Sequence, residues 1–585
     1  MKKTADDMNL SRPSNTLTPV GSHSSQIPEK EEPEPRIQRQ DDVVQVYPSG
    51  PRLAAITIGL FLAIFCLGLD RSILATAIPK ITTEFNSLSD VSWYGSAYLF
   101  TQCSFQLFFG KIYSEYSIKW IFLIALAIFE VGSVICAAAP NSAALIIGRA
   151  ISGVGAAGLM SGALIVRFDV IILMEDELTE AQIVAKAVPL HKRPTYTATV
   201  GAAAGVSQVI APTLGGVFVD KATWRWCFWI NLPMGGITFV AVLLFLNLNG
   251  PEQQSKQTSG FKSFFRKFDL MGTLFLIPWV ICLLLALQWG GTEYAWSNWR
   301  IILCWCVFGL CLPLWAFIQY RKGEEATIPL RIIIQRTMFC ASWMILLLFS
   351  LLYINIYYIP IWLQTVKNHS AFQSGVDLLA SSASMVVATI VAGALTSRIG
   401  YYVPQLIASS ILTSVAGGLI FSFTVHTSTG FWVASLILMG LGVGLGGQQC
   451  IIAAQTVFEG GDIALATSVL MFLQSLGGAV FLAVAQNIFS SRLVSELHRN
   501  VPNVNPAVVI EAGASELISS MRKVYPESID GIIDAYNKSL QTVFLIATIL
   551  GCLTVFGAVF IEWKSVKKDL PESEEKHPAD GEVEK

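Results

Sequence analysis

The sequence predicts an all-α integral membrane protein with fourteen transmembrane helices, arranged as two six-helix halves with two further helices inserted between them. Composition is the first reason, because 53% of the 585 residues are hydrophobic and only 14% are charged, whereas soluble domains carry about 25% charged residues. The second reason is the number of long apolar segments. The third is a pair of glycine motifs that recurs in the two parts of the chain.

The two ends of the chain are polar and are expected to be cytoplasmic tails. Residues 1–50 are rich in Ser, Pro, Gln and Glu, so they cannot bury enough apolar surface to offset chain entropy and should be disordered. Residues 564–585 form the second tail. No apolar stretch precedes Ala54, so the first membrane helix should direct the chain to the membrane. A net charge of −2 gives no reason to expect a nucleic-acid partner.

Fourteen segments have the length of about 20 residues that a helix needs to cross the hydrocarbon core. They predict a first half at 51–248, a cytoplasmic linker with spans 7 and 8 at 249–336, and a second half at 337–563. The approximate span limits are 54–78, 92–111, 120–139, 143–165, 196–218, 227–247, 270–289, 300–320, 338–363, 375–396, 403–424, 431–454, 463–488 and 541–562.

Basic residues predict the orientation of these spans. With both termini in the cytoplasm, most Lys and Arg of the connecting loops lie inside, which is the usual pattern of a multi-pass protein. The plasma membrane is the expected location. Two Asn-x-Ser sequons, at Asn368 and Asn537, then lie outside and are predicted glycosylation sites. The connection 489–540 also lies outside and is long enough for short amphipathic helices.

Two glycine-rich motifs form an internal repeat. Span 4 contains Gly153-Val-Gly155-Ala-Ala-Gly158, and span 12 contains Gly442-Val-Gly444-Leu-Gly446-Gly447. A dinucleotide site would need a preceding strand, which neither copy has, so we interpret both as small residues that let membrane helices approach closely. Each follows an earlier landmark glycine, Gly110 or Gly393, by 43 or 49 residues. Repeated halves around a central site are typical of transporters.

Four motifs of the first half carry a family resemblance. They are Leu69-Asp70-Arg71-Ser-Ile-Leu-Ala-Thr-Ala-Ile-Pro79, Trp93-Tyr-Gly-Ser-Ala-Tyr-Leu, Gly148-Arg149-Ala-Ile-Ser-Gly153-Val-Gly155 and Trp224-Arg225-Trp226-Cys-Phe-Trp-Ile-Asn231-Leu-Pro233. The chain thereby resembles the fungal fourteen-span drug:proton antiporters of the major facilitator superfamily, and the toxin-efflux branch is most similar. The resemblance covers about 50–565 and implies the major facilitator fold, although it specifies no substrate.

The span-5 signature of these antiporters is present in a modified form. Its central proline is Pro212, and Gly215 and Gly216 follow it, whereas Ser207 and Ala211 replace two consensus glycines. Small residues at these positions keep close helix packing possible, and the proline kink is retained.

Ionisable residues inside membrane spans are the first candidates for chemistry, because a charge near the bilayer centre costs several kcal/mol. By resemblance, Arg149 is the span-4 arginine assigned to proton transfer and Asp70 belongs to the span-1 acidic motif. Glu130 in span 3 is a further proton-coupling candidate. The alternatives are a structural Asp70–Arg149 ion pair and a helix-to-helix hydrogen bond at Glu130. Arg71 is interpreted as an outward-facing residue that snorkels to the interface.

Uncharged polar residues in apolar helices are candidates for a substrate cavity, because amides can bind a polar organic molecule without a fixed charge. Interhelical hydrogen bonding is the alternative for each amide. For Trp362, placement in the interfacial aromatic belt is favoured. The predicted cavity residues are Gln208, Gln448, Gln449, Gln474 and Tyr357.

A stretch at the end of span 4 departs from the expected pattern. Residues 166–182 carry five acids in a region where the neighbouring sequence is basic. We interpret the stretch as a retained intron, because Val166 can begin with a GT donor, Gln182 can be a CAG acceptor and excision keeps the reading frame. A regulatory cytoplasmic loop is the alternative.

These features together predict proton-coupled export of a small amphipathic organic molecule, such as a secondary metabolite, toxin or drug. The sequence contains no G-x-x-x-x-G-K-S/T motif for ATP and no metal-ligand spacing, so neither a cofactor nor a metal is expected. The expected partners are substrate, protons and lipid, and a monomer is the family expectation. An importer of a nutrient or siderophore, or a vacuolar transporter, is the same-fold alternative. A membrane enzyme or receptor would need a ligand cluster or a nucleophile, and the sequence shows neither.

Overall fold

The computed structural model describes residues 50–85, 90–172, 221–245 and 269–567, apart from 292, 459–460, 512–517 and 519–520, together with short pieces of 203–219. These residues belong to one compact unit, Tyr47–Lys585. They form helices and no named β-strand, so the all-α class is confirmed for this part of the chain. The predicted tails and most of the linker lie outside the described residues.

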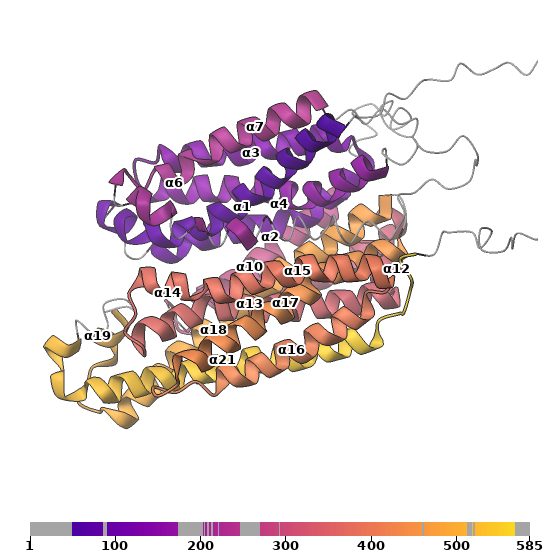
Figure 1. Cartoon of the computed structure of the whole chain (residues 1–585). Helices are drawn as coiled ribbons and strands as arrows, with labels where there is room; N and C mark the ends of the chain where they lie inside the picture. The colour runs from indigo at the N-terminus through magenta and orange to yellow at the C-terminus, as the bar shows by residue number, and fades with distance from the viewer. Residues whose placement is uncertain are drawn as a thin grey trace, which may run out of the picture. The chain divides into compact units, whose positions relative to one another are not determined.

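Long helices dominate the unit (Figure 1). Eleven described helical segments are long and apolar enough to cross a membrane. Spans 1 and 2 correspond to two further helices, α1 and α2, and about half of the predicted span 5 lies outside the described residues. The helices are α1 (Gly50–Phe85), α2 (Val91–Glu115), α3 (Ile118–Ala137), α4 (Ser142–Ile172), α6 (Trp226–Trp229), α7 (Asn231–Phe245), α10 (Leu270–Trp289), α11 (Trp299–Lys322), α12 (Leu330–Ile334), α13 (Arg336–Thr365), α14 (Ala371–Asp377), α15 (Leu379–Ile399), α16 (Val403–Phe421), α17 (Thr429–Val457), α18 (Gly461–Asn500), α19 (Pro506–Glu511) and α21 (Ile529–Phe560).

The helices pack as two sets that follow the order of the sequence. In the first set, α4 lies against α2 and α3, and α7 lies against α1 and α3. In the second set, α17 lies against α15 and α16, while α21 lies against α13, α16 and α18. The main contact between the sets joins α2 to α18. A Cβ on Gly110 of α2 would lie 2.4 Å from the Cβ of Ser468 in α18, so glycine permits this approach.

The inserted pair α10 and α11 attaches to both sets through α10. The Trp279 ring of α10 contacts Phe472 of α18, and Trp289 at the other end of α10 contacts Trp93 of α2. Helix α11 packs on α10 and leaves large apolar side chains exposed, among them Leu310.

Asp269 joins the two inserted helices at one end. It caps α10 by accepting a hydrogen bond from the Gly272 amide at 2.7 Å, and it forms an ion pair of 3.0 Å with Lys322 of α11. Burial opposes ionisation of Asp269, but the bonds from Lys322, Gly272, Gln319 and Thr327 outweigh it and lower the pKa of the carboxyl group.

The glycine motifs bring equivalent helices together in the two sets. A Cβ on Gly153 of α4 would lie 2.3 Å from the carbonyl oxygen of Tyr98 in α2. A Cβ on Gly444 of α17 would lie 2.3 Å from the carbonyl oxygen of Met385 in α15. Helices α2 and α15 are the second long helices of their sets, and Gly440 of α17 has the same relation, since a Cβ there would lie 2.1 Å from the carbonyl oxygen of Ser381 in α15.

The next glycine of each motif has the same relation to the third helix. A Cβ on Gly155 would meet α3 at 2.4 Å, and a Cβ on Gly446 would meet α16 at 2.2 Å. The glycine repeat is therefore present in the packing, but its contacts do not select one register, because Gly440 meets α15 as Gly444 does and Gly442 meets α16 as Gly446 does. Gly442 itself packs against α16.

Several helix limits differ from those predicted. Helix α18 continues to Asn500, and α21 begins at Ile529, so both extend into the predicted loop 489–540. Leu493 and Leu497 are buried in the extension of α18, although the polar residues around them lower the hydropathy of that segment. Helix α4 likewise continues to Ile172, seven residues into the predicted insertion. The rest of the insertion lies outside the described residues.

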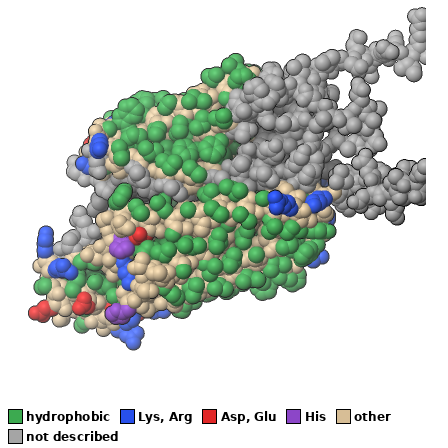
Figure 2. All heavy atoms as spheres, in the orientation of Figure 1, with side chains coloured by type: hydrophobic (Ala, Val, Ile, Leu, Met, Phe, Trp, Pro, Cys, Tyr) green, Lys and Arg blue, Asp and Glu red, His purple; other side chains and the backbone are tan. Residues whose placement is uncertain are grey.

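The outer surface has the character of a membrane protein. Figure 2 shows hydrophobic side chains over much of the described helical surface on the face it presents, with charged side chains mainly toward the helix ends. Exposed large residues include Ile124 on α3, Leu244 on α7 and Phe556 on α21. Such a surface is suited to contact with lipid.

Candidate functional site

Asp70 and Arg149 form an ion pair inside the first set of helices. Asp70 of α1 is 0% exposed and Arg149 of α4 is 1% exposed, and Arg149 Nη1 donates to Asp70 Oδ2 at 2.6 Å. Arg149 Nε also donates to the carbonyl oxygen of Tyr94 in α2, at 3.0 Å. The guanidinium carbon lies 4.4 Å from the ring centroid of Tyr98, within cation–π range. The two residues predicted from separate motifs are therefore in direct contact.

Asn231 completes the polar cluster around Asp70. Its Nδ2 donates to Asp70 Oδ1 at 3.2 Å and to Ser133 Oγ of α3 at 3.1 Å, and Cys66 Sγ donates to Asn231 Oδ1 at 3.2 Å. All four side chains are buried. The cluster thus connects α1, α3 and the first residue of α7, and through Arg149 also α4 and α2.

Asn231 is a site residue that the sequence prediction does not include. It lies inside the Trp224–Pro233 motif, and it is an amide in an apolar helix, as the predicted glutamines are. Its partner Asp70 is 161 positions away in the chain, so no local pattern identifies the contact.

Arg71 does not snorkel outward, and that prediction is wrong. Its Nη1 donates to the Tyr353 hydroxyl of α13 at 3.1 Å, and its Nη2 donates to Gln102 Oε1 of α2. The guanidinium also lies over the Tyr98 ring, with 5.7 Å from its carbon to the centroid. Arg71 therefore connects the first set of helices to α13 of the second set.

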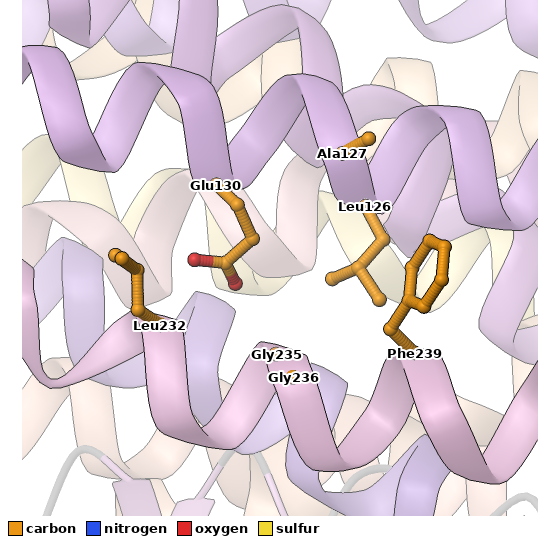
Figure 3. A pocket seen from close by; sticks show the side chains of 7 residues that line it. All are labelled: Leu126, Ala127, Glu130, Leu232, Gly235, Gly236 and Phe239. Carbon is orange, nitrogen blue, oxygen red and sulfur yellow. The ribbon is translucent and has the colours of Figure 1, made fainter.

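Glu130 is separate from this network and lines a pocket between α3 and α7 (Figure 3). Both carboxylate oxygens are buried, and neither has a hydrogen-bond partner among the described residues. The pocket has a volume of about 350 Å³ and is otherwise lined by Leu126, Ala127, Leu232, Gly235, Gly236 and Phe239. The alternative interpretation of Glu130 as a helix-to-helix hydrogen bond finds no partner in the part of the chain that is described.

The amides of the second set have different environments. Gln449 Oε1 accepts from Thr396 Oγ1 of α15 at 2.8 Å, which is an interhelical hydrogen bond. Gln448 has a buried Oε1 with no partner among the residues described. Gln474 is buried in α18. Tyr357 is 56% exposed and its ring contacts that of Tyr358. Their roles in a substrate cavity stay predictions.

Two predictions near the other end of the second set need correction. Trp362 is buried in the core, not in an interfacial belt, and its Nε1 donates to Asn537 Oδ1 at 2.9 Å. Asn537 is 4% exposed, so its amide nitrogen is inaccessible to a glycan in the folded protein. Asn368 is exposed and has a φ of 56°, and its glycosylation stays a prediction.

The remaining predicted site residues lie in span 5 and α15. Gln208 and Pro212 fall outside the described residues. Gly215 is buried within a short helical piece, and a Cβ on the adjacent Gly216 would meet no described atom within 4 Å. Gly393 is buried in α15.

Comparison with known proteins gives the family of this arrangement. The model of the Major Facilitator Superfamily matches residues 60–171 and 179–482 and leaves 172–178 between its two pieces. The MFS-type efflux pump MFS1 of Arthroderma benhamiae is 45% identical over 519 residues, which cover 89% of this chain and 93% of the relative. The efflux pump aflT of Aspergillus parasiticus is 43% identical over 522 residues, with 89% and 97% covered.

Solved structures support the fold alone. The proton:xylose symporter XylE is similar with a TM-score of 0.53 and 14% identity, over 88% of this chain and 97% of that one. The human organic anion transporter MFSD10 has a TM-score of 0.51 and 14% identity, over 85% and 99%. From the family match over most of its length and the identity to these pumps, the chain belongs to the Major Facilitator Superfamily, in the group of its fungal efflux pumps.

Proposed function

We propose that the protein exports a small amphipathic organic compound and that proton movement through the Asp70–Arg149 cluster drives the export. The direction is supported by relatives named as efflux pumps, which share over two-fifths of their residues with this chain. The proton coupling is supported by one observation, the fully buried ion pair between α1 and α4. We assign the protein to transport and not to enzymatic catalysis.

The buried pair is suited to coupling because its two charges depend on each other. Protonation of Asp70 removes the charge that holds Arg149, and an uncompensated buried arginine is unfavourable by several kcal/mol. The guanidinium must then find another acceptor or reach water. Arg149 also donates a hydrogen bond to Tyr94 of α2, and Asp70 accepts one from Asn231 of α7. Movement of the guanidinium therefore alters contacts among the helices of the first set.

The alternative is that the Asp70–Arg149 ion pair is purely structural. A structural role and a coupling role differ in one respect. A structural pair contributes to stability alone, whereas a coupling pair changes its protonation during each cycle. Opening the cluster alternately to the two sides of the membrane would expose Asp70 to two proton reservoirs, which is the requirement for secondary transport by alternating access.

We further propose fourteen spans, two six-helix halves and cytoplasmic termini in the plasma membrane. Residues 51–248 and 337–563 form the halves, and 249–336 hold the linker and inserted helices. For residues 166–182, the break in the family match at 172–178 supports an insertion relative to other members. Sequencing of the transcript across codons 160–190 tests the intron hypothesis, and a uniformly unspliced message would contradict it.

Vesicles with an imposed pH gradient test the coupling. The purified full-length protein is reconstituted, and accumulation of a panel of labelled amphipathic compounds is measured with and without the gradient. Asp70→Asn and Arg149→Ala should abolish gradient-driven accumulation, whereas exchange of labelled for unlabelled compound at equal pH should continue with Asp70→Asn.

Glu84→Gln provides the matched control, because it breaks the partly exposed Glu84–Arg225 pair, also held by α1, without touching the cluster. Its gradient-driven accumulation should equal that of the wild type. Full accumulation by both Asp70→Asn and Arg149→Ala would remove the pair from the coupling mechanism. Uptake into intact cells, in place of export, would favour the importer alternative.

A further inference from the structure

The pocket between α3 and α7 contains a single ionisable group that the transport cluster does not use. Glu130 extends from α3 toward α7, and in Figure 3 its carboxylate lies between Leu232 on one side and Leu126 with Phe239 on the other. A Cβ on Gly235 would lie 1.8 Å from Glu130 Oε1, so glycine at this position makes room for the carboxyl group. The backbone of α7 therefore forms the wall that the carboxyl group faces.

The carboxyl group lacks a partner in the described part of the protein. Neither oxygen accepts a hydrogen bond there, and no Lys, Arg or His among the described residues forms an ion pair with Glu130. A buried polar group without a partner costs free energy that a bound donor can recover. The neighbouring Asp70 is different, because Arg149 and Asn231 satisfy it.

The pocket opens to the side of the molecule that carries exposed apolar residues. Its lining residues Ala127, Gly236 and Phe239 are themselves exposed. On the same helices, Val131 and Val240 are each more than 50% exposed. Glu130 is the thirteenth of twenty residues in α3, so it lies well inside the span. A molecule dissolved in the hydrocarbon can reach the pocket without passing through the aqueous phase.

We propose that this pocket binds amphipathic amines from the lipid phase, with Glu130 accepting the N–H donors of the amine and the apolar wall holding its chain. A hydrogen-bond donor with positive charge complements the carboxyl group, and a hydrocarbon chain complements Leu126, Leu232 and Phe239. The inference goes beyond the proposed function, since neither Asp70 nor Arg149 takes part in it. It identifies a lateral site with its own ligand class.

Carbodiimide capture tests the site directly. The full-length protein in phosphatidylcholine vesicles is treated with dicyclohexylcarbodiimide and dodecylamine at several pH values between 5 and 8. The reagent adds to the protonated carboxyl group and gives an O-acylisourea. The amine nitrogen of a bound molecule then attacks the acyl carbon, a C–N bond forms, and dicyclohexylurea leaves with the proton. Mass spectrometry should find the dodecylamide at Glu130, whereas without amine the reagent alone should form an N-acylurea there.

Selectivity and competition decide the ligand class. Asp70 should stay unmodified because it is enclosed, and Glu84 should gain little dodecylamide because its partly exposed carboxylate is paired with Arg225. Dodecanol should need about tenfold or more concentration than N,N-dimethyldodecylamine to suppress capture, because the protonated tertiary amine donates a charge-assisted N–H hydrogen bond to the carboxylate and cannot itself form an amide. Equal competition by dodecanol would overturn the preference for amines.

Two glycine variants provide a matched pair. A side chain at Gly236 would start in open space within the pocket, and one at Gly418 of α16 would also start in open space, far from it in sequence. Gly236→Leu should reduce capture at Glu130 at least about tenfold by filling the pocket, while Gly418→Leu should leave it unchanged. Absence of any label at Glu130 over the whole pH range, or full capture in Gly236→Leu, would overturn the proposal.

Discussion

Replacing Asp70 by asparagine should destabilise the protein because it leaves Arg149 buried without its counter-charge. Removing one partner of a buried pair costs about 3–5 kcal/mol. Arg149 keeps its hydrogen bond to the Tyr94 carbonyl and its contact with the Tyr98 ring, so we expect the lower end, about 3 kcal/mol. Arg149→Met in the same chain removes the stranded charge. The double variant should therefore stay within about 1 kcal/mol of the wild type. Because Arg149→Met alone leaves Asp70 without its counter-charge and should cost about as much as Asp70→Asn, the coupling energy should be about 5 kcal/mol.

The assay combines unfolding with transport. Titration with sodium dodecyl sulfate in mixed micelles gives the free energy of unfolding for the wild type, both single variants and the double variant. The same four proteins are then reconstituted with a pH gradient. The double variant should be nearly as stable as the wild type and yet fail to accumulate substrate. A stable double variant with normal gradient-driven accumulation would refute the coupling role and leave a structural pair.

The more exposed Glu84–Arg225 pair serves as the control for the coupling energy. The same double-variant cycle on this pair should give a coupling energy of at most about 1 kcal/mol.

Three further predictions follow from contacts outside the cluster. Because the pKa of Asp269 is lowered in the folded protein, the stabilisation by its carboxylate should be complete above about pH 4 and lost as the pH falls through the lowered pKa. Asp269→Asn should flatten this acid limb of stability, measured as the unfolding midpoint against pH. Gly153→Ala and Gly444→Ala should each destabilise the protein by about 1–3 kcal/mol or more, because the new Cβ would overlap a neighbouring backbone carbonyl. Gly418→Ala is the control: its Cβ would meet no described atom within 4 Å, and stability should change by about 0.5 kcal/mol or less. Asn368→Gln should remove any glycosidase-sensitive shift in electrophoretic mobility; Asn537→Gln should leave that shift in place and lower stability through the lost Trp362 contact.

The membrane class and the order of the helices could be predicted because they depend on composition and length, which are local properties. The end of α18 could not, since a helix continues as long as one face is buried, and Leu493 and Leu497 supply that face within an otherwise polar segment. Hydropathy averages over all faces of the helix and therefore predicted an earlier end.

The candidate site shows the same division between local and long-range information. Asp70 and Arg149 could be selected because a charge in a membrane span is conspicuous in the sequence. Their contact with Asn231, and the inward direction of Arg71, depend on which helices are neighbours. Adjacent residues of a helix differ by about 100° in direction, so Asp70 can face α4 and α7 while Arg71 faces α2 and α13. The sequence alone does not identify α2 and α13 as the neighbours of Arg71.

The buried charge pair and the amides lie in different halves of the molecule. The first half holds the Asp70–Arg149 pair of α1 and α4. In the second half, Gly440 of α17 leaves no room for a side chain beside α15, because a Cβ there would lie 2.1 Å from the Ser381 carbonyl oxygen.

The candidate polar residues of α17 are uncharged. Gln448 and Gln449 follow Gly444 by four and five residues, and Gln449 accepts a hydrogen bond from Thr396 of α15. Because amides do not titrate, these two residues cannot respond directly to a proton, whereas the Asp70–Arg149 pair can. We therefore expect substitutions of Gln448 to change substrate affinity while the pH dependence of transport stays that of the wild type, and substitutions in the Asp70 cluster to change the pH dependence.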